Sequence, residues 1–237
     1  MCRMPTDTRT MPAGAKESFA RLAGVTVLTA VLLFLTAGTI RWGWGWVYLA
    51  LICAVLLVYT RTLLALHPDL IEERRQPPPD AKAWDKPLVA ILAVAGPVAQ
   101  IVVCGLDHRA GFSPPMTAGW HLAGAAAVAF GGAFTNWAVA HNRFFSGLVR
   151  IQRDRGHVVV DSGPYRLMRH PGYAGSILHT LGTSFLLGSW WSLAVALPVI
   201  AVMGVRTALE DRTLRAELDG YEGYARRVRF RLLPGVW

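Results

Sequence analysis

Residues 172–205 read GYAGSILHTLGTSFLLGSWWSLAVALPVIAVMGV and contain no Asp, Glu, Lys or Arg. A membrane-spanning helix needs about 20 apolar residues, so this run is too long for one helix and short for two. The sequence Gly188-Ser189-Trp190-Trp191 supplies a break, and its tryptophans suit a membrane–water interface. The stretch therefore predicts a tight hairpin of two membrane helices.

Four earlier uncharged runs each have about the length of one spanning helix. They are Leu22–Ile40, Trp42–Thr60, Pro87–Leu106 and Pro114–Ala140. Only 16% of the 237 residues are charged, against roughly 25% in soluble domains, and 53% are hydrophobic. We therefore expect an all-α polytopic membrane protein with about six transmembrane helices. Residues 1–140 would hold the first four, and residues 141–237 would form the functional region.

The basic residues are distributed unevenly along a chain of formal charge +9. They cluster before the first run, between the second and third, after the fourth and in the tail, at Arg3, Arg9, Lys16, Arg21, Arg74, Arg75, Lys82, Lys86, Arg143, Arg150, Arg153, Arg155, Arg166, Arg169, Arg226, Arg227, Arg229 and Arg231. The positive-inside rule then places both termini and the functional region in the cytoplasm, in an inner or plasma membrane. Because arginines that flank membrane spans are a topology signal, we expect membrane lipids and no nucleic acid as partners. Cys2, Cys53 and Cys104 show no paired spacing for a metal or a disulfide.

A stiff polar segment precedes the hairpin. Gly163-Pro164 and His170-Pro171 bracket it, and each proline fixes its own φ and biases the residue before it away from helix. His170 would then lie at the start of a helix, where free N–H groups attract an anion such as a carboxylate. The alternative is an ordinary capped re-entry into the membrane.

A second polar cluster follows the hairpin. Arg206, Glu210 and Glu217 lie close to one helical face, and charges that emerge at the membrane rim are costly unless they are paired or used. The alternative is surface salt bridging, for example between Asp211 and Arg215.

Several short motifs occur in a fixed order over about residues 141–234. They are NRFFS (142–146), GHVV (156–159), GPY (163–165), RHPGYAG (169–175), RTALEDRTL (206–214) and GYEGYARRV (220–228). In this order the motifs resemble the isoprenylcysteine carboxyl methyltransferase family, which belongs with the phospholipid methyltransferases. Residues 1–140 are similar only as a set of membrane helices.

The resemblance implies an integral membrane methyltransferase that uses S-adenosylmethionine and acts on a lipophilic or prenylated acceptor. It also implies roles for individual residues: cofactor binding by His157, Val158, Gly163, Pro164, Tyr165, His170, Tyr173, Gly175 and Glu210, catalysis by Arg206 and Glu210, and acceptor binding by Asn142 and Arg206. Asp211 stands where the family has a second Glu, which leaves its role open.

Methyl transfer to a carboxylate needs alignment in a dry cavity more than acid–base machinery, because the carboxylate is already ionised. Arg206 would then hold that carboxylate with two parallel hydrogen bonds. If the acceptor is a hydroxyl or an amine, His141 or His170 is the candidate base.

Two other classes stay open on the sequence. A membrane reductase would bind a nicotinamide nucleotide and would need a place for its extra phosphates, for which Arg150, Arg153 and Arg155 could serve. A non-enzymatic membrane protein would need neither polar cluster. The chain has no Gly-x-Gly-x-x-Gly after a strand, so we expect no soluble Rossmann-type site.

Overall fold

The computed structural model describes residues 14–75, 78 and 80–237, and within these residues all regular structure is helical. The helices are α1 (Ala15–Ala37), α2 (Gly43–Leu66), α3 (Pro68–Glu73), α4 (Asp85–Ala90), the π-helical η1 (Ile91–Ala95), α5 (Gly96–Ala110), α6 (Ala118–His141), the 3₁₀-helical η2 (Arg153–Arg155) and η3 (Gly163–Arg166), α7 (Pro171–Leu186), α8 (Trp191–Glu217) and α9 (Tyr221–Arg227). The predicted all-α class is confirmed. Cys2, Arg3 and Arg9 lie outside the described residues.

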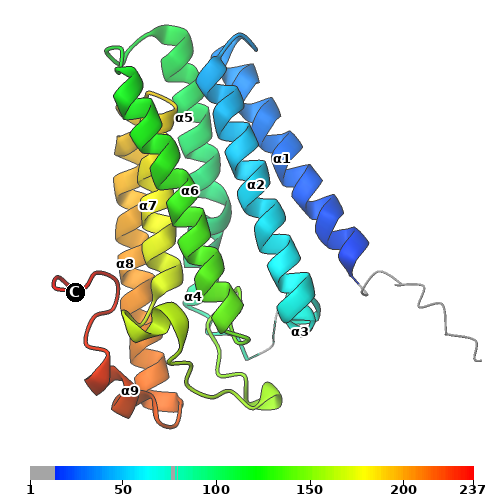
Figure 1. The fold of residues 1–237 in the computed structure, drawn as a ribbon, viewed down its shortest axis with the longest axis vertical. Helices are drawn as coiled ribbons and strands as arrows, with labels where there is room; N and C mark the ends of the chain where they lie inside the picture. Colours follow the sequence, from blue (N-terminus) through cyan, green and yellow to red (C-terminus); the bar gives the residue numbers. More distant parts are fainter. Residues whose placement is uncertain (1–13, 76–77, 79) are drawn as a thin grey trace, which may run out of the picture.

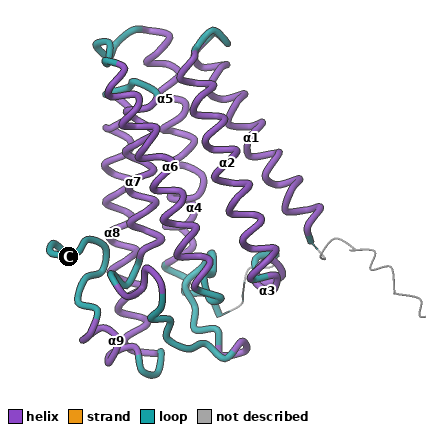
Figure 2. Tube along the Cα trace, viewed as in Figure 1, coloured by secondary structure: helices purple, strands orange, loops and turns teal. Residues whose placement is uncertain are grey.

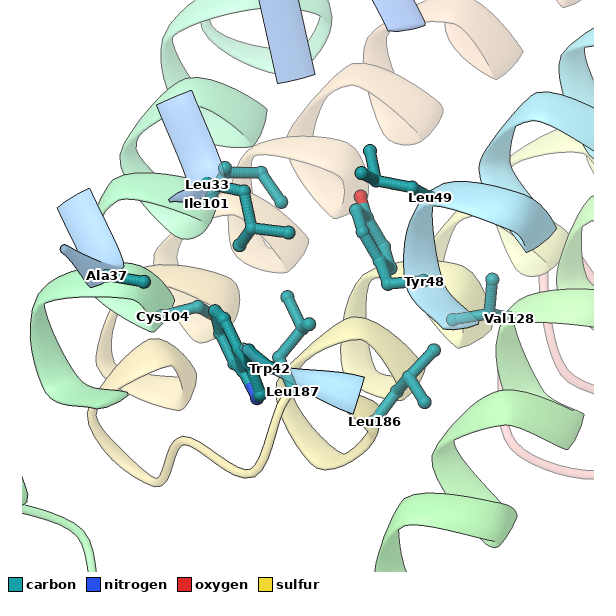
Figure 3. Close-up of a cluster of buried hydrophobic side chains, with 10 residues drawn as sticks. All are labelled: Leu33, Ala37, Trp42, Tyr48, Leu49, Ile101, Cys104, Val128, Leu186 and Leu187. Atoms are coloured by element: carbon teal, nitrogen blue, oxygen red, sulfur yellow. The ribbon is translucent and has the colours of Figure 1, made fainter. Parts of the chain in front are cut away.

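The long helices form a bundle in which each helix packs against two neighbours around the bundle (Figure 1). Contacts join α1 to α2, α2 to α6, α6 to α7, α7 to α8, α8 to α5 and α5 back to α1. The apolar core between them includes Leu33 of α1, Tyr48 of α2, Ile101 of α5 and Leu186 of α7 (Figure 3). Helices α1, α2, α5, α6 and α7 therefore share one core.

Five helical stretches are long and apolar enough to cross a membrane. Four of them are α1, α2, α6 and α8, and the fifth is the continuous stretch Asp85–Ala110, which consists of α4, η1 and α5. The polytopic membrane class is thus confirmed. Helix α7 has 16 residues and extends about 24 Å, less than the roughly 30 Å of a hydrocarbon core. The count of six spanning helices stays a prediction.

The predicted hairpin break is confirmed between α7 and α8. Gly188 has φ 73°, in the left-handed region that only glycine enters without strain. Ser189 caps the turn, since its hydroxyl donates to Asp107 of α5 and accepts from the Ser192 backbone N–H. Helix α8 continues to Glu217, well beyond Val205, because the absence of charge marks only the apolar part of a helix.

The connections that carry most of the basic residues lie at one end of the bundle. The start of α1, residues 80–84 before α4, residues 142–170 and the C-terminal segment all lie there (Figure 2). This arrangement agrees with the inferred charge asymmetry. The side of the membrane that this end faces stays a prediction.

Glycines bring α6 and α7 into close contact. A Cβ placed on Gly131 of α6 would lie 2.5 Å from the Gly175 carbonyl oxygen and 2.7 Å from the His179 backbone nitrogen, both in α7. Gly124 and Gly182 form a similar pair nearer the hairpin. Small residues let membrane helices approach closely, so α7 is held at a fixed depth against α6.

Gly131→Ala tests this contact. The added methyl group meets backbone atoms that cannot move independently, so we expect a loss of about 1–3 kcal/mol of stability despite the better helix propensity of alanine. The measurement is the thermal midpoint of the detergent-purified protein.

Gly204→Ala in α8 is the matched control, because its Cβ would meet no atom within 4 Å. We expect this variant to be unchanged or slightly more stable. Equal midpoints for the two variants would contradict close packing at Gly131.

Candidate active site

A cavity of about 350 Å³ lies where α6 ends, α7 begins and α8 passes the end of the bundle. This volume falls within the roughly 300–1,000 Å³ typical of small-molecule sites. The residues expected at the site that line it are Asn142, His157, Val158, Tyr165, His170, Tyr173, Arg206 and Glu210. Residues distant in the sequence thus meet at one cavity.

The start of α7 is held by the C-terminal segment. His170 is the N-cap and Pro171 the first helical residue, as predicted. The backbone N–H groups of Arg169 and His170 donate to the carbonyls of Phe230 and Arg231, both at 2.9 Å. The stiff polar segment is therefore fixed from outside as well as by its own prolines.

Asp211 is fully buried and joins three arginines. Its carboxylate oxygens lie 2.8 Å from Arg169 Nε, 3.0 Å from Arg231 Nε and 3.2 Å from Arg215 Nε. The Tyr221 hydroxyl donates to it at 3.1 Å. Asp211 thus ties α8 to the start of α7 and to the C-terminal segment. The pair with Arg215, given above as an example of surface salt bridging, is present, but its carboxylate is buried.

Asp211→Asn tests that role. Removing the charge leaves Arg169 buried without a counterion, which should cost about 3–5 kcal/mol. We expect a lower thermal midpoint and faster proteolysis within residues 221–237. Asp219→Asn, an exposed acid just past the end of α8, is the control and should behave like the wild type. Unchanged proteolysis of Asp211→Asn would contradict the proposed tie.

Arg206 lines the cavity, but one edge of its guanidinium is already occupied. Asp85, at the start of α4, accepts from Nε at 2.6 Å and from Nη2 at 2.8 Å. Nη2 also donates to the Gly147 carbonyl at 3.0 Å, and the guanidinium carbon lies 5.4 Å from the centre of the Tyr173 ring. The Nε–Nη2 edge is thus not open for a two-point grip on an acceptor, whereas Nη1 has no acceptor among the described residues.

Glu210 lies one turn further along α8 and also lines the cavity. It accepts a hydrogen bond from the Tyr173 hydroxyl at 2.7 Å. No Lys, Arg or His nitrogen of the described chain lies within 4.0 Å of its carboxylate. The cavity wall therefore carries a negative charge without an ion-pair partner.

His157 lines the cavity and is neutral at pH 7. Burial, together with the positive charges of Arg150 and Arg155, lowers its pKa to about 4. Nδ1 accepts the Gln152 backbone N–H at 3.3 Å, so the ring proton sits on Nε2. The imidazole packs against Phe144, with ring centroids 4.5 Å apart. His157 can thus offer one neutral donor to a ligand.

The side chains of Tyr165 and Asn142 are joined by a hydrogen bond. The Asn142 amide donates to the Tyr165 hydroxyl at 3.0 Å, and its oxygen accepts the Phe144 backbone N–H at 2.8 Å. Burial raises the pKa of Tyr165, so its hydroxyl stays protonated. Both groups of the Asn142 side chain already have protein partners, and acceptor binding by Asn142 stays a prediction.

Three expected cofactor residues lie outside the cavity lining. Gly163 and Pro164 form the start of η3, where Gly163 has φ 55° and a Cβ would meet the His141 ring. Gly175 faces α6 at the close helix contact. These residues shape the walls, and their direct contact with a cofactor stays a prediction.

Two of the three arginines that could serve a nucleotide's phosphates are already paired with carboxylates. Arg150 is buried and pairs with Glu73, Asp80 and Asp154. Arg155 pairs with Asp69 and also donates to Gln152. These contacts weigh against a nicotinamide nucleotide in this cavity.

Asp85 is the site residue that sequence reasoning missed. A signal was present, because Asp85 lies two residues before the uncharged run that begins at Pro87, and Arg206 directly follows the one that ends at Val205. Two opposite charges at the membrane rim suggest a pair. Nothing in the sequence says that these two helices are neighbours.

The fold and the cavity define a polytopic helical membrane protein with a polar site at one end, and residues 120–217 match the phospholipid methyltransferase family. A probable protein-S-isoprenylcysteine O-methyltransferase of Oryza sativa subsp. indica is 35% identical over 92 residues, 38% of this chain and 48% of that protein.

Two further relatives match over similar lengths. Protein-S-isoprenylcysteine O-methyltransferase B of Arabidopsis thaliana is 33% identical over 92 residues, 38% of this chain and 47% of that protein. Protein-S-isoprenylcysteine O-methyltransferase of Schizosaccharomyces pombe is 35% identical over 86 residues, 35% of this chain and 36% of that protein. The chain thus spans under half the length of each of these three relatives, and the resemblance inferred from the motifs is confirmed.

Proposed function

We propose that this protein is an S-adenosylmethionine-dependent methyltransferase of the membrane that methylates a carboxylate on a lipophilic acceptor such as a prenylated cysteine. The observation that carries the proposal is a pair of opposite charges on one turn of α8: the carboxylate of Glu210, without an ion-pair partner in the described chain, and the Nη1 edge of Arg206. A cationic donor and an anionic acceptor are the ligands that such a pair favours.

The cavity residues fit a methyl donor that carries a sulfonium and an ammonium group. Glu210 attracts either cation. His170 Nε2 is buried, lies 3.5 Å from Asp211 Oδ1 and has no hydrogen-bond partner among the described residues. Its ring lines the cavity wall, so His170 can contact the donor through the ring. The run Val158–Val160 offers an apolar wall for the adenosine part.

When bound, S-adenosylmethionine supplies an electrophilic methyl group, and its sulfur leaves as a thioether when the acceptor oxygen forms the new bond. The chain's own residues need only align and desolvate the two reactants. Arg206 holds the acceptor oxygen through Nη1. Tyr173 stays protonated on Glu210 and keeps that carboxylate turned toward the donor. No residue has to remove a proton from a carboxylate.

A second cavity supports a lipophilic acceptor. It measures about 160 Å³, lies among α1, α2 and α3, and includes Tyr59, which also lines the main cavity. Its walls include the apolar side chains Leu22, Val25, Leu56 and Leu63. An apolar chain can lie between α1 and α2 while its polar end points past Tyr59. We also propose that this end of the bundle faces the cytoplasm, and the charge distribution along the sequence supports this orientation.

The test combines binding with turnover on the detergent-purified chain. We expect heat of binding from S-adenosylmethionine and its demethylated product and none from NADPH. We also expect transfer of labelled methyl to N-acetyl-S-farnesylcysteine. The methyl ester of that compound is the control and should accept no label, because its carboxylate is blocked. Binding of NADPH without binding of the methyl donor would overturn the proposal.

Arg206→Lys separates acceptor binding from donor binding. Lysine keeps the charge but lacks the planar fork that fixes the group, so turnover should fall about a hundredfold while affinity for the demethylated product stays within a few-fold. Arg212→Lys, an exposed arginine of the same helix, is the control and should keep wild-type turnover. Wild-type turnover in Arg206→Lys would remove Arg206 from the site.

A further inference from the structure

The ion pair between Asp85 and Arg206 joins a region inside the family match to a region outside it. Arg206 belongs to residues 120–217, which match the methyltransferase family, and Asp85 lies outside that match. Asp85 has no exposed surface, and the Arg206 side chain is 11% exposed. Both charges have therefore left water, and each needs the other.

Asp85 fixes which part of Arg206 faces the cavity. Its two oxygens occupy Nε and one proton of Nη2, and the Gly147 carbonyl takes the second Nη2 proton. A free arginine side chain has many rotamers, and ordering it costs about 2 kcal/mol. With three of its five N–H groups bound by protein, the guanidinium is held in one plane with Nη1 directed away from Asp85.

Asp85 is itself held by its surroundings. Its Oδ2 also accepts the Val149 backbone N–H at 2.7 Å, and the Val149 carbonyl accepts the Lys82 N–H at 2.9 Å. Asp85 also lies in the first turn of α4, where the helix dipole favours a negative charge. The carboxylate therefore has a defined position before any ligand binds.

We propose that Asp85 is a positioning residue that orients Arg206 toward the acceptor, so that the N-terminal helices supply part of the methyl-transfer site. This inference rests on the proposed function. It goes beyond that function, because it assigns a role to a residue outside the matched segment.

A neighbouring ion pair offers a matched control. Lys82 pairs with Glu217 at 2.7 Å, which joins the segment before α4 to α8 as Asp85 does. This pair is partly exposed and has no part in the cavity lining. If Asp85 only fastened α4 to α8, loss of the Lys82–Glu217 pair would affect the same contact.

The experiment compares Asp85→Asn, Arg206→Gln, the double variant Asp85→Asn/Arg206→Gln and Glu217→Gln. Each is assayed for methyl transfer to N-acetyl-S-farnesylcysteine and for binding of S-adenosylhomocysteine. The double variant removes both buried charges together, so it lacks the unpaired guanidinium that would destabilise Asp85→Asn and the unpaired carboxylate that would destabilise Arg206→Gln.

We expect Asp85→Asn to lower kcat/KM for the acceptor about a hundredfold and to leave the affinity for S-adenosylhomocysteine within threefold. Arg206→Gln and the double variant should have equal kcat/KM, because Asp85 acts only through Arg206. Glu217→Gln should match the wild type.

Two results would overturn the inference. One is an Asp85→Asn variant within threefold of wild-type kcat/KM. The other is a double variant that falls below Arg206→Gln by the same factor as Asp85→Asn falls below the wild type. A wild-type chain that transfers no methyl group would instead overturn the proposed function, so the two failures are distinguishable.

Discussion

A charge that is carried out of water at the end of a membrane helix must be paired, and this constraint organises one end of the molecule. Helix α8 brings Arg206 and Asp211 to positions that the protein buries. Asp85 pairs with Arg206, and the arginines around Asp211 pair with Asp211. Because burying a single ion costs several kcal/mol, these pairs bind the helices and the C-terminal segment into one fixed arrangement.

The same ion pairs leave polar groups of Arg206 and Glu210 available to a ligand in the cavity. Arg206 gives its Nε–Nη2 edge to the protein and keeps Nη1, while Glu210 receives only a neutral hydroxyl from Tyr173. Arg150 and Arg155, by contrast, have their charges balanced by carboxylates. The difference between balanced and unbalanced charges favours a donor that is positive and an acceptor that is negative over a nucleotide with several phosphates.

Close helix packing supports this electrostatic arrangement. The glycines of α6 and α7 set the depth of α7, and the N-cap of that helix, His170, lines the cavity. A displacement of α7 against α6 would move His170 and Tyr173 relative to α8. The polar site thus depends on contacts between residues that carry no charge at all.

The sequence by itself determined the membrane class, the helix hairpin with its break at Gly188, the start of α7 at Pro171 and eight of the residues that line the cavity. These features follow from local signals: hydrophobic length, proline and glycine stereochemistry, and short motifs. Only the tertiary structure decided that Asp85 reaches Arg206, that Asp211 joins three arginines, and that Gly175 packs on α6 instead of lining the cavity. Most of these contacts join different helices, and the way in which membrane helices pack is set by side-chain fit between them, which no single stretch of sequence encodes.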